Sequence, residues 1–153
     1  MYKAIFVKDN NSLFKIVTND VELKRFAFNA NPYNIVDLTK EEFDSANFLE
    51  TTLSYENGNL TKTSIVSDYS TVEKFTNRID ALKADFQLRI DDAERGEKIP
   101  AEVLEICQAQ LNILNAVDLN NPPATGVTVY RHLHNLGIPV LGHWEFSNLF
   151  YVN

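Results

Sequence analysis

Residues 70–100, STVEKFTNRIDALKADFQLRIDDAERGEKIP, predict a long amphipathic helix and the turn that ends it. Apolar residues recur at spacings of three and four, which gives one narrow stripe of the kind that forms a coiled-coil seam. Ser70 with Glu73 predicts a capping box at the start of the helix. We expect Gly96 to end the helix in the left-handed conformation and Pro100 to begin the next one. The stripe consists of Val72, Phe75, Ile79, Leu82, Phe86, Ile90 and Ala93.

The residues after Pro100 predict a second helix, which would pack against the first as an antiparallel helical hairpin. Its apolar residues cover about half of the circumference at roughly 100° per residue, which is wider than one partner helix needs. The N-terminal unit, the C-terminal segment or another subunit must therefore cover the rest. The first helix would be about 37 Å long, which suits a projecting arm for docking or oligomerisation. The apolar residues of the second helix are Val103, Leu104, Ile106, Cys107, Leu111, Ile113, Leu114 and Val117.

Residues 1–68 predict a small α+β unit with two β-hairpins. The pair Asn57-Gly58 is the strongest hairpin signal in the chain, because both residues accept positive φ at little cost. Thr39 stands three residues before Glu42, which predicts a capping box and a short helix through Ala46. The other expected elements are strands at 2–7 and 13–17 joined by a turn, a helix at 21–28, a strand at 33–38, and strand segments at 53–55 and 60–66.

Residues 119–153 form a C-terminal segment that is nearly free of charge. Only Arg131 and Glu145 are charged there, whereas residues 71–118 carry 16 charged side chains. Apolar surface of this kind is normally covered by the chain's own core or by a partner. Two interpretations stay open and do not exclude each other: the segment folds back over the second helix, or it packs into a neighbouring subunit. The expected elements are a short helix at 129–136 that ends at Gly137, and extended segments at 139–141 and 145–152.

The composition is that of a globular protein, with 44% hydrophobic and 23% charged residues. The net charge of −7 disfavours nucleic acid as a partner, because an acidic surface repels phosphate. One cysteine rules out an intramolecular disulfide, and no apolar run reaches the ~20 residues that a membrane helix needs. We expect a protein made in the cytoplasm that binds neither nucleic acid nor membrane. Its expected segments are 1–68, 69–118 and 119–153.

No arrangement of polar residues predicts catalysis, a metal site or a cofactor. On a helix His132 and His134 point about 200° apart, so they cannot chelate one metal together, and no set of nearby ligands completes a site with His143. Cys107 lies on the apolar face of the second helix, where a small buried hydrophobe is expected. The aromatic residues of the N-terminal unit are spaced as core residues are. They are Phe6, Phe14, Phe26, Phe28, Tyr33 and Phe43.

The order of segments resembles that of small tail-associated proteins of tailed bacteriophages, a group of virion accessory and tail-fibre assembly proteins. The features that carry the resemblance are YNIVDLTKEEF at 33–43, YENGNL at 55–60, the long hairpin at 70–118 and YRHL at 130–133. The resemblance covers most of the chain in order. It implies a non-catalytic role on or near a phage particle.

We therefore expect a structural or interaction protein and no enzyme. It would be a virion component of the tail, fibre or baseplate that forms a homo-oligomer and contacts other virion proteins. The alternative is a tail-fibre assembly chaperone that is absent from the mature particle. Aromatic and apolar residues of the hairpin and the C-terminal segment would form the interface, because interface cores favour aromatics and lack charge. They are Val72, Phe75, Ile79, Leu82, Phe86, Ile106, Ile113, Tyr130, Trp144, Phe146, Phe150 and Tyr151.

Overall fold

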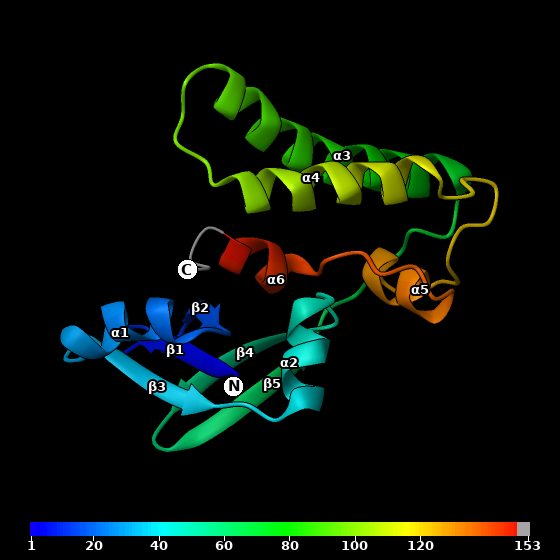
Figure 1. Ribbon diagram of the computed structural model, residues 1–153. Helices are drawn as coiled ribbons and strands as arrows, with labels where there is room; N and C mark the ends of the chain where they lie inside the picture. Colours follow the sequence, from blue (N-terminus) through cyan, green and yellow to red (C-terminus); the bar gives the residue numbers. More distant parts are fainter. Residues whose placement is uncertain (150–153) are drawn as a thin grey trace. The chain divides into compact units, whose positions relative to one another are not determined.

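The computed structural model describes residues 1–149, which belong to two compact units (Figure 1). The sheet unit contains Met1–Val66 together with the C-terminal residues from Gly142 onward, and the helical unit contains Ser67–Leu141. Strands and helices occur together, which confirms the predicted α+β class. The units differ from the three expected segments, because the C-terminal segment is divided between them: residues 119–141 belong to the helical unit and residues from 142 onward to the sheet unit.

The elements of each unit follow the chain in order. The sheet unit holds β1 (Lys3–Val7), β2 (Leu13–Val17), α1 (Asp20–Phe28), β3 (Tyr33–Asp37), α2 (Lys40–Asn47), β4 (Thr51–Glu56), β5 (Asn59–Ser64) and α6 (His143–Asn148). The helical unit holds α3 (Val72–Glu94), α4 (Ala101–Asn115) and α5 (Val129–Asn135).

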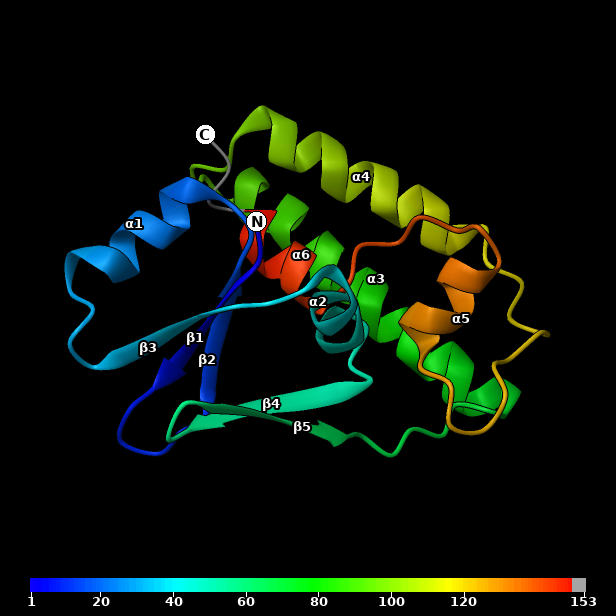
Figure 2. The same ribbon diagram turned by 90° about the horizontal axis from the view of Figure 1, so that it is seen from below.

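The sheet unit contains a three-stranded sheet in the order β2-β1-β3 and a separate β4–β5 hairpin (Figure 2). All three pairings are antiparallel, and Ala4 of β1 lies opposite both Ile16 and Val36. Asn57 and Gly58 have φ of 51° and 79°, so the predicted hairpin turn is confirmed. The predicted strands at 2–7, 13–17 and 33–38 agree with β1, β2 and β3 to within one residue at each end.

The core of the sheet unit lies on one face of the three-stranded sheet. The predicted capping box at Thr39 and Glu42 is present and begins α2, which packs Phe43 into this core. Trp144 of α6 is partly buried against the same cluster. Its buried members are Ala4, Phe6, Ile16, Leu38, Phe43, Ala46 and Leu53.

A β-bulge in β2 changes the direction of one aromatic side chain. Ile5 lies opposite Lys15 and Phe6 lies opposite Leu13, so Phe14 is an extra residue in the pairing. The strict alternation of inward and outward side chains is lost at this point. As a result Phe14 contacts Phe26 of α1 instead of joining the core, and 53% of it is exposed. The prediction that Phe14 and Phe28 are core residues is wrong, since Phe28 is 94% exposed.

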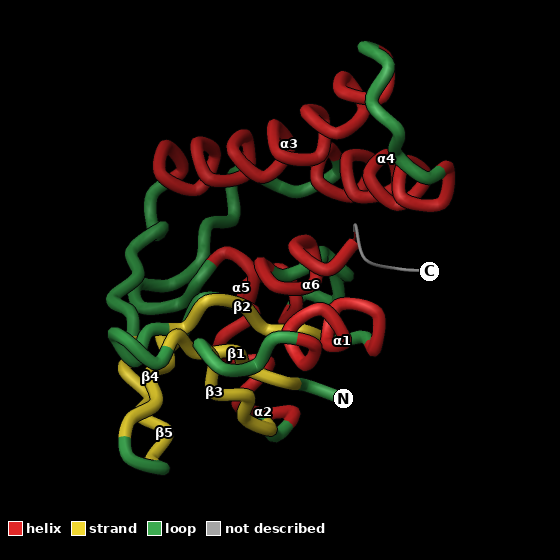
Figure 3. Tube along the Cα trace, turned by 90° about the vertical axis from the view of Figure 1, so that its left-hand side faces the viewer, coloured by secondary structure: helices red, strands yellow, loops and turns green. Residues whose placement is uncertain are grey.

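The helical unit is built on α3 and α4, which run alongside each other (Figures 1 and 3). Gly96 follows α3 with φ of 98°, as predicted, and Pro100 directly precedes α4. The predicted cap at Ser70 is wrong: Thr71 caps α3 by accepting from the Lys74 N–H, while the Ser70 hydroxyl donates to Asp68. Hydrogen bonds from Ser70, together with Lys74, lower the pKa of the Asp68 carboxyl to about 2.

Residues 129–141 pack against the helical hairpin within one chain: α5 contacts α3, and the segment after α5 contacts α4. Gln110 on α4 is 6% exposed, and its side-chain amide donates to the Pro139 carbonyl at 3.2 Å and accepts from the Leu141 N–H at 2.9 Å. The predicted helix at 129–136 is present as α5, and Gly137 follows it with φ of 75°. The first half of the charge-poor segment is therefore part of the fold of one chain.

The prediction of an extended segment at 145–152 is wrong for residues 145–148, because these residues lie in the helix α6. The prediction missed the helix because its start depends on a residue of α2. Asn47 accepts from two backbone N–H groups of the first turn of α6, and such groups have no partner within a helix. Residues 150–152 lie outside the part of the chain that the structure describes.

Candidate functional site

Asn47 connects the first turn of α6 to α2. Its Oδ1 atom accepts from the N–H of Trp144 at 2.9 Å and from the N–H of Glu145 at 3.1 Å, while its Nδ2 donates to Glu145 Oε1 at 2.6 Å. Only 1% of Asn47 is exposed. Gly142 has to be small here, since a Cβ atom at this position would lie 2.3 Å from Asn47 Nδ2. One buried amide therefore serves as the N-terminal cap of α6.

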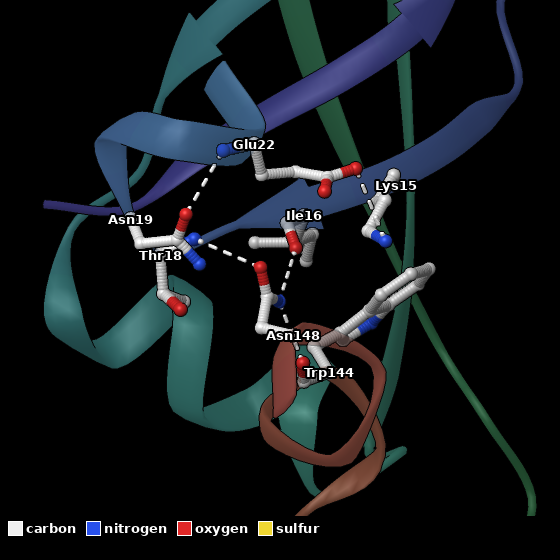
Figure 4. Close-up of polar contacts among 7 residues, drawn as sticks. All are labelled: Lys15, Ile16, Thr18, Asn19, Glu22, Trp144 and Asn148. Carbon is white, nitrogen blue, oxygen red and sulfur yellow. Dashed lines mark hydrogen bonds and ion pairs between the residues drawn. The ribbon is translucent and has the colours of Figure 1, made fainter. Parts of the chain in front are cut away.

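Asn148 connects the last turn of α6 to the edge strand β2 (Figure 4). Its Nδ2 donates to the Ile16 carbonyl at 2.8 Å, and its Oδ1 accepts from the Thr18 N–H at 3.3 Å. An edge strand presents unpaired backbone groups that can pair with other chains. The Asn148 amide forms hydrogen bonds with two of these groups, as the backbone of a neighbouring strand would. Both ends of α6 are thus joined to the sheet unit by asparagine side chains.

Replacement of either asparagine by alanine should destabilise the sheet unit. Asn47→Ala and Asn148→Ala each leave buried backbone groups without partners, and we expect a loss of about 1–3 kcal/mol in the free energy of unfolding. Trp144 is the only tryptophan, so its fluorescence in a urea titration reports on this unit. Asn29→Ala, at the exposed end of α1, is the matched control. A loss no larger than that of the control would contradict the role assigned to the two amides.

A nearly buried ion pair joins β2 to α1 next to this contact (Figure 4). Lys15 Nζ lies 3.2 Å from Glu22 Oε1, and the two side chains are 11% and 4% exposed. Asn19 caps α1 by accepting from the Glu22 N–H at 2.9 Å. Glu22 Oε2 is buried without a hydrogen-bond partner among the described residues. Burial makes the charge of each partner costly unless the other charge is present.

Removal of one partner of this ion pair should cost more than removal of both. Glu22→Gln takes the opposite charge from a nearly buried ammonium, and we expect a loss of about 3–5 kcal/mol in the free energy of unfolding. The double variant Lys15→Met with Glu22→Leu should recover most of that loss. Asp44→Asn, which breaks the exposed pair with Lys40, is the control and should cost about 0.5 kcal/mol or less. Urea titrations followed by Trp144 fluorescence measure all three, and equal losses in Glu22→Gln and the control would contradict the expectation.

Three aromatic rings form a cluster at the surface of the sheet unit. Phe14, Phe26 and Tyr33 contact one another, with ring centroids 5.3 to 5.8 Å apart. We call these three residues the aromatic surface cluster. Phe28 lies two residues beyond Phe26 on the same helix, so its side chain points to the other side of α1, where it is 94% exposed. The sequence carries no local signal for this surface, because the bulge at Phe14 depends on the pairing of β1 with β2.

The structure places the predicted interface residues in three different environments. Phe75, Ile79, Leu82, Phe86 and Tyr130 are at most 5% exposed, so they have almost no surface left for a partner. Val72 is 47% exposed and Ile106 is 37% exposed. The half-buried residues are Ile113, Trp144 and Phe146, and Phe150 and Tyr151 lie outside the described residues.

An apolar groove lies between α3 and α4. Ile90, Ala93 and Leu104 supply its apolar part, and its volume is about 450 Å³. Glu94 and Glu105 also line it and bring negative charge to it. An apolar groove bordered by carboxylates suits an apolar side chain that is accompanied by a cation.

Among residues 1–149 no group of three or more His, Cys, Asp and Glu residues could hold a metal ion. Cys107 is fully buried, and burial raises the pKa of its thiol, which keeps it protonated near pH 7. His132 has its Nε2 atom 2.8 Å from the Asn121 carbonyl and its ring edge-on to Phe75. No helix in the described part of the chain is both long and apolar enough to cross a membrane.

Comparison with known proteins gave no relatives: no family model matches the chain, and neither curated proteins nor solved structures gave a match.

Proposed function

We propose that this protein is a non-catalytic structural component of a tailed-bacteriophage particle, in the tail, fibre or baseplate, and that it assembles with copies of itself. The observation that carries the proposal is the exposure of two aromatic side chains on one folded chain, Phe28 at 94% and Phe14 at 53%. The resemblance in segment order to small tail-associated phage proteins supports the setting in a virion. Other virion proteins are the further partners that we propose.

The exposed aromatic side chains of the sheet unit have the properties of an interface core. Full burial of a phenylalanine side chain contributes about 1.5–3 kcal/mol, so exposed rings favour any contact that covers them. Aromatic residues are enriched at the centres of protein interfaces. The rings of Phe14, Phe26 and Tyr33 already pack against one another, so little side-chain freedom is lost when a partner covers them.

The charge beside Phe28 complements the charges of the groove between α3 and α4. Lys24 precedes Phe28 by one helical turn on α1, so the two side chains are neighbours. Glu94 and Glu105 line the apolar groove. We infer that Phe28 of one copy enters the groove of the next copy, where Lys24 meets a carboxylate. A contact between two different surfaces of the same chain builds rings or open filaments, which are the assemblies of which tails consist.

Loss of the Phe28 ring should reduce self-association. Phe28→Ser removes about 2 kcal/mol of apolar burial from each contact, which is a factor of more than ten in the dissociation constant. Size-exclusion chromatography with light scattering should show an oligomer for the wild type and a smaller mass for the variant at equal concentration. Leu136→Ser removes another apolar side chain, 52% exposed, and should leave the mass unchanged.

A charge exchange tests the geometry of this contact. Lys24→Glu and Glu105→Lys should each weaken association, and the two together should restore it, because the pair of opposite charges is rebuilt in reverse. A wild type that stays monomeric up to about 100 μM would contradict self-assembly.

Whether the protein is part of the phage particle is tested separately from its self-association. Mass spectrometry of purified phage particles should find this protein in fixed copy number. Its absence from particles, together with its presence on unassembled fibre protein in the infected cell, would favour the assembly chaperone instead.

A further inference from the structure

The tip of the β4–β5 hairpin carries an asparagine followed by a glycine. Asn57 and Gly58 connect β4 to β5, and both are exposed to solvent. The side-chain carbonyl carbon of an asparagine and the backbone nitrogen of the next residue can close a five-membered ring, and a side chain on that next residue crowds the closure. Asn57 is the only asparagine in the chain that precedes a glycine. It is therefore the asparagine at which the following residue hinders ring closure least.

The described residues leave Asn57 and Gly58 free to move. A Cβ atom on Gly58 would have no atom within 4 Å, apart from those of the adjacent residues. Among residues 1–149, no hydrogen bond holds the Asn57 side chain or the Gly58 N–H, and the backbone carbonyl of Asn57 accepts from Asn59 Nδ2 at 3.5 Å. Exposed positions with few contacts are those that open locally at little cost. The tip can therefore open while the rest of the sheet unit stays folded.

The conformation of the closed turn opposes ring closure. Asn57 and Gly58 have φ of 51° and 79°, both in the left-handed region. With ψ of about 47°, which is usual for this region, the Gly58 nitrogen points away from the Asn57 side chain. Rotation about the Cα–C bond of Asn57 brings the two groups together, and this rotation opens the turn. The rate of ring closure therefore depends on how often the hairpin tip opens.

We propose that Asn57 is a site of spontaneous deamidation, in which water is the only co-reactant. The backbone nitrogen of Gly58 attacks Cγ of Asn57, and the new N–C bond closes a succinimide ring. The Cγ–Nδ2 bond breaks, and Nδ2 leaves as ammonia with the proton of the Gly58 N–H. Water then adds to one of the two ring carbonyls. Opening at Cγ gives aspartate, and opening at the backbone carbonyl gives isoaspartate, in which the main chain runs through Cβ and Cγ.

The two products affect the hairpin differently. Aspartate keeps the turn, because Asp-Gly suits a two-residue hairpin loop as well as Asn-Gly does. Isoaspartate adds one methylene group to the main chain, so Glu56 and Asn59 lose the spacing at which they pair across the turn. Strand pairing is then lost first at this end of β4 and β5. The site is distinct from Phe28 and from the groove of the helical unit, so it does not depend on self-assembly.

The test is a time course of the full chain in warm, mildly alkaline buffer, followed by peptide mapping with mass spectrometry. Asn57 should gain the mass that distinguishes a hydroxyl from an amino group, and its peptide should separate into two chromatographic peaks of equal mass. Asn59 is the internal control, because it is exposed on the same hairpin but is followed by Leu60. Asn59 should convert at least about ten-fold more slowly, which corresponds to a barrier higher by about 1.4 kcal/mol. Equal conversion at the two positions, or none at Asn57, would overturn the proposal.

Two variants separate the chemistry from its effect on the hairpin. Gly58→Asn retains a residue that accepts positive φ but crowds ring closure, so Asn57 should convert about ten-fold more slowly than in the wild type. A wild-type rate in this variant would contradict attack by the Gly58 nitrogen. Asn57→Asp supplies the aspartate product with the turn intact. NMR hydrogen exchange of the Asn59 amide should be faster in the isoaspartate product than in Asn57→Asp, and equal exchange would contradict the loss of strand pairing.

Discussion

The docking of α6 onto the sheet unit is the interaction on which the rest of that unit depends. Two buried amides carry it: Asn47 caps the first turn, and Asn148 occupies the edge of β2. Between them Trp144 packs against the core cluster. Without α6 the edge of β2 would be open.

These contacts join parts of the chain that are far apart in sequence. Asn47 and Trp144 are separated by 97 residues, and Ile16 and Asn148 by 132. In the sequence, residues 67–141 of the helical unit separate them. The main contact within that unit is between α3 and α4. Contacts between distant residues form slowly because a long loop has to close first. The sheet unit is therefore complete only after the last helix has been synthesised, whereas the α3–α4 hairpin can form from local contacts.

The surfaces available to partners follow from how strands pair. The bulge in β2 directs Phe14 to α1, where three aromatic rings meet at the surface. The predicted interface included the α3 stripe, whose residues Phe75, Ile79, Leu82 and Phe86 are buried in one chain. An apolar stripe at helical spacing shows that a helix face is covered, but does not show whether the same chain covers it.

Local chemistry alone determined much of this fold. The stripe of α3, the glycine after it, the capping box at Thr39 and the Asn57-Gly58 turn all depend on residues within a few positions of each other, so each was predictable. The structure of residues 142–149 was not predictable in this way. Asn47 supplies the cap of α6 from a distant part of the chain. The absence of charge predicted that these residues are covered, by the same chain or by a neighbouring subunit, but not that they pack against β2 and α2. The aromatic surface cluster could not be predicted from local sequence either. The bulge that turns Phe14 toward α1 exists only when two strands have met, because pairing register is a property of both strands together.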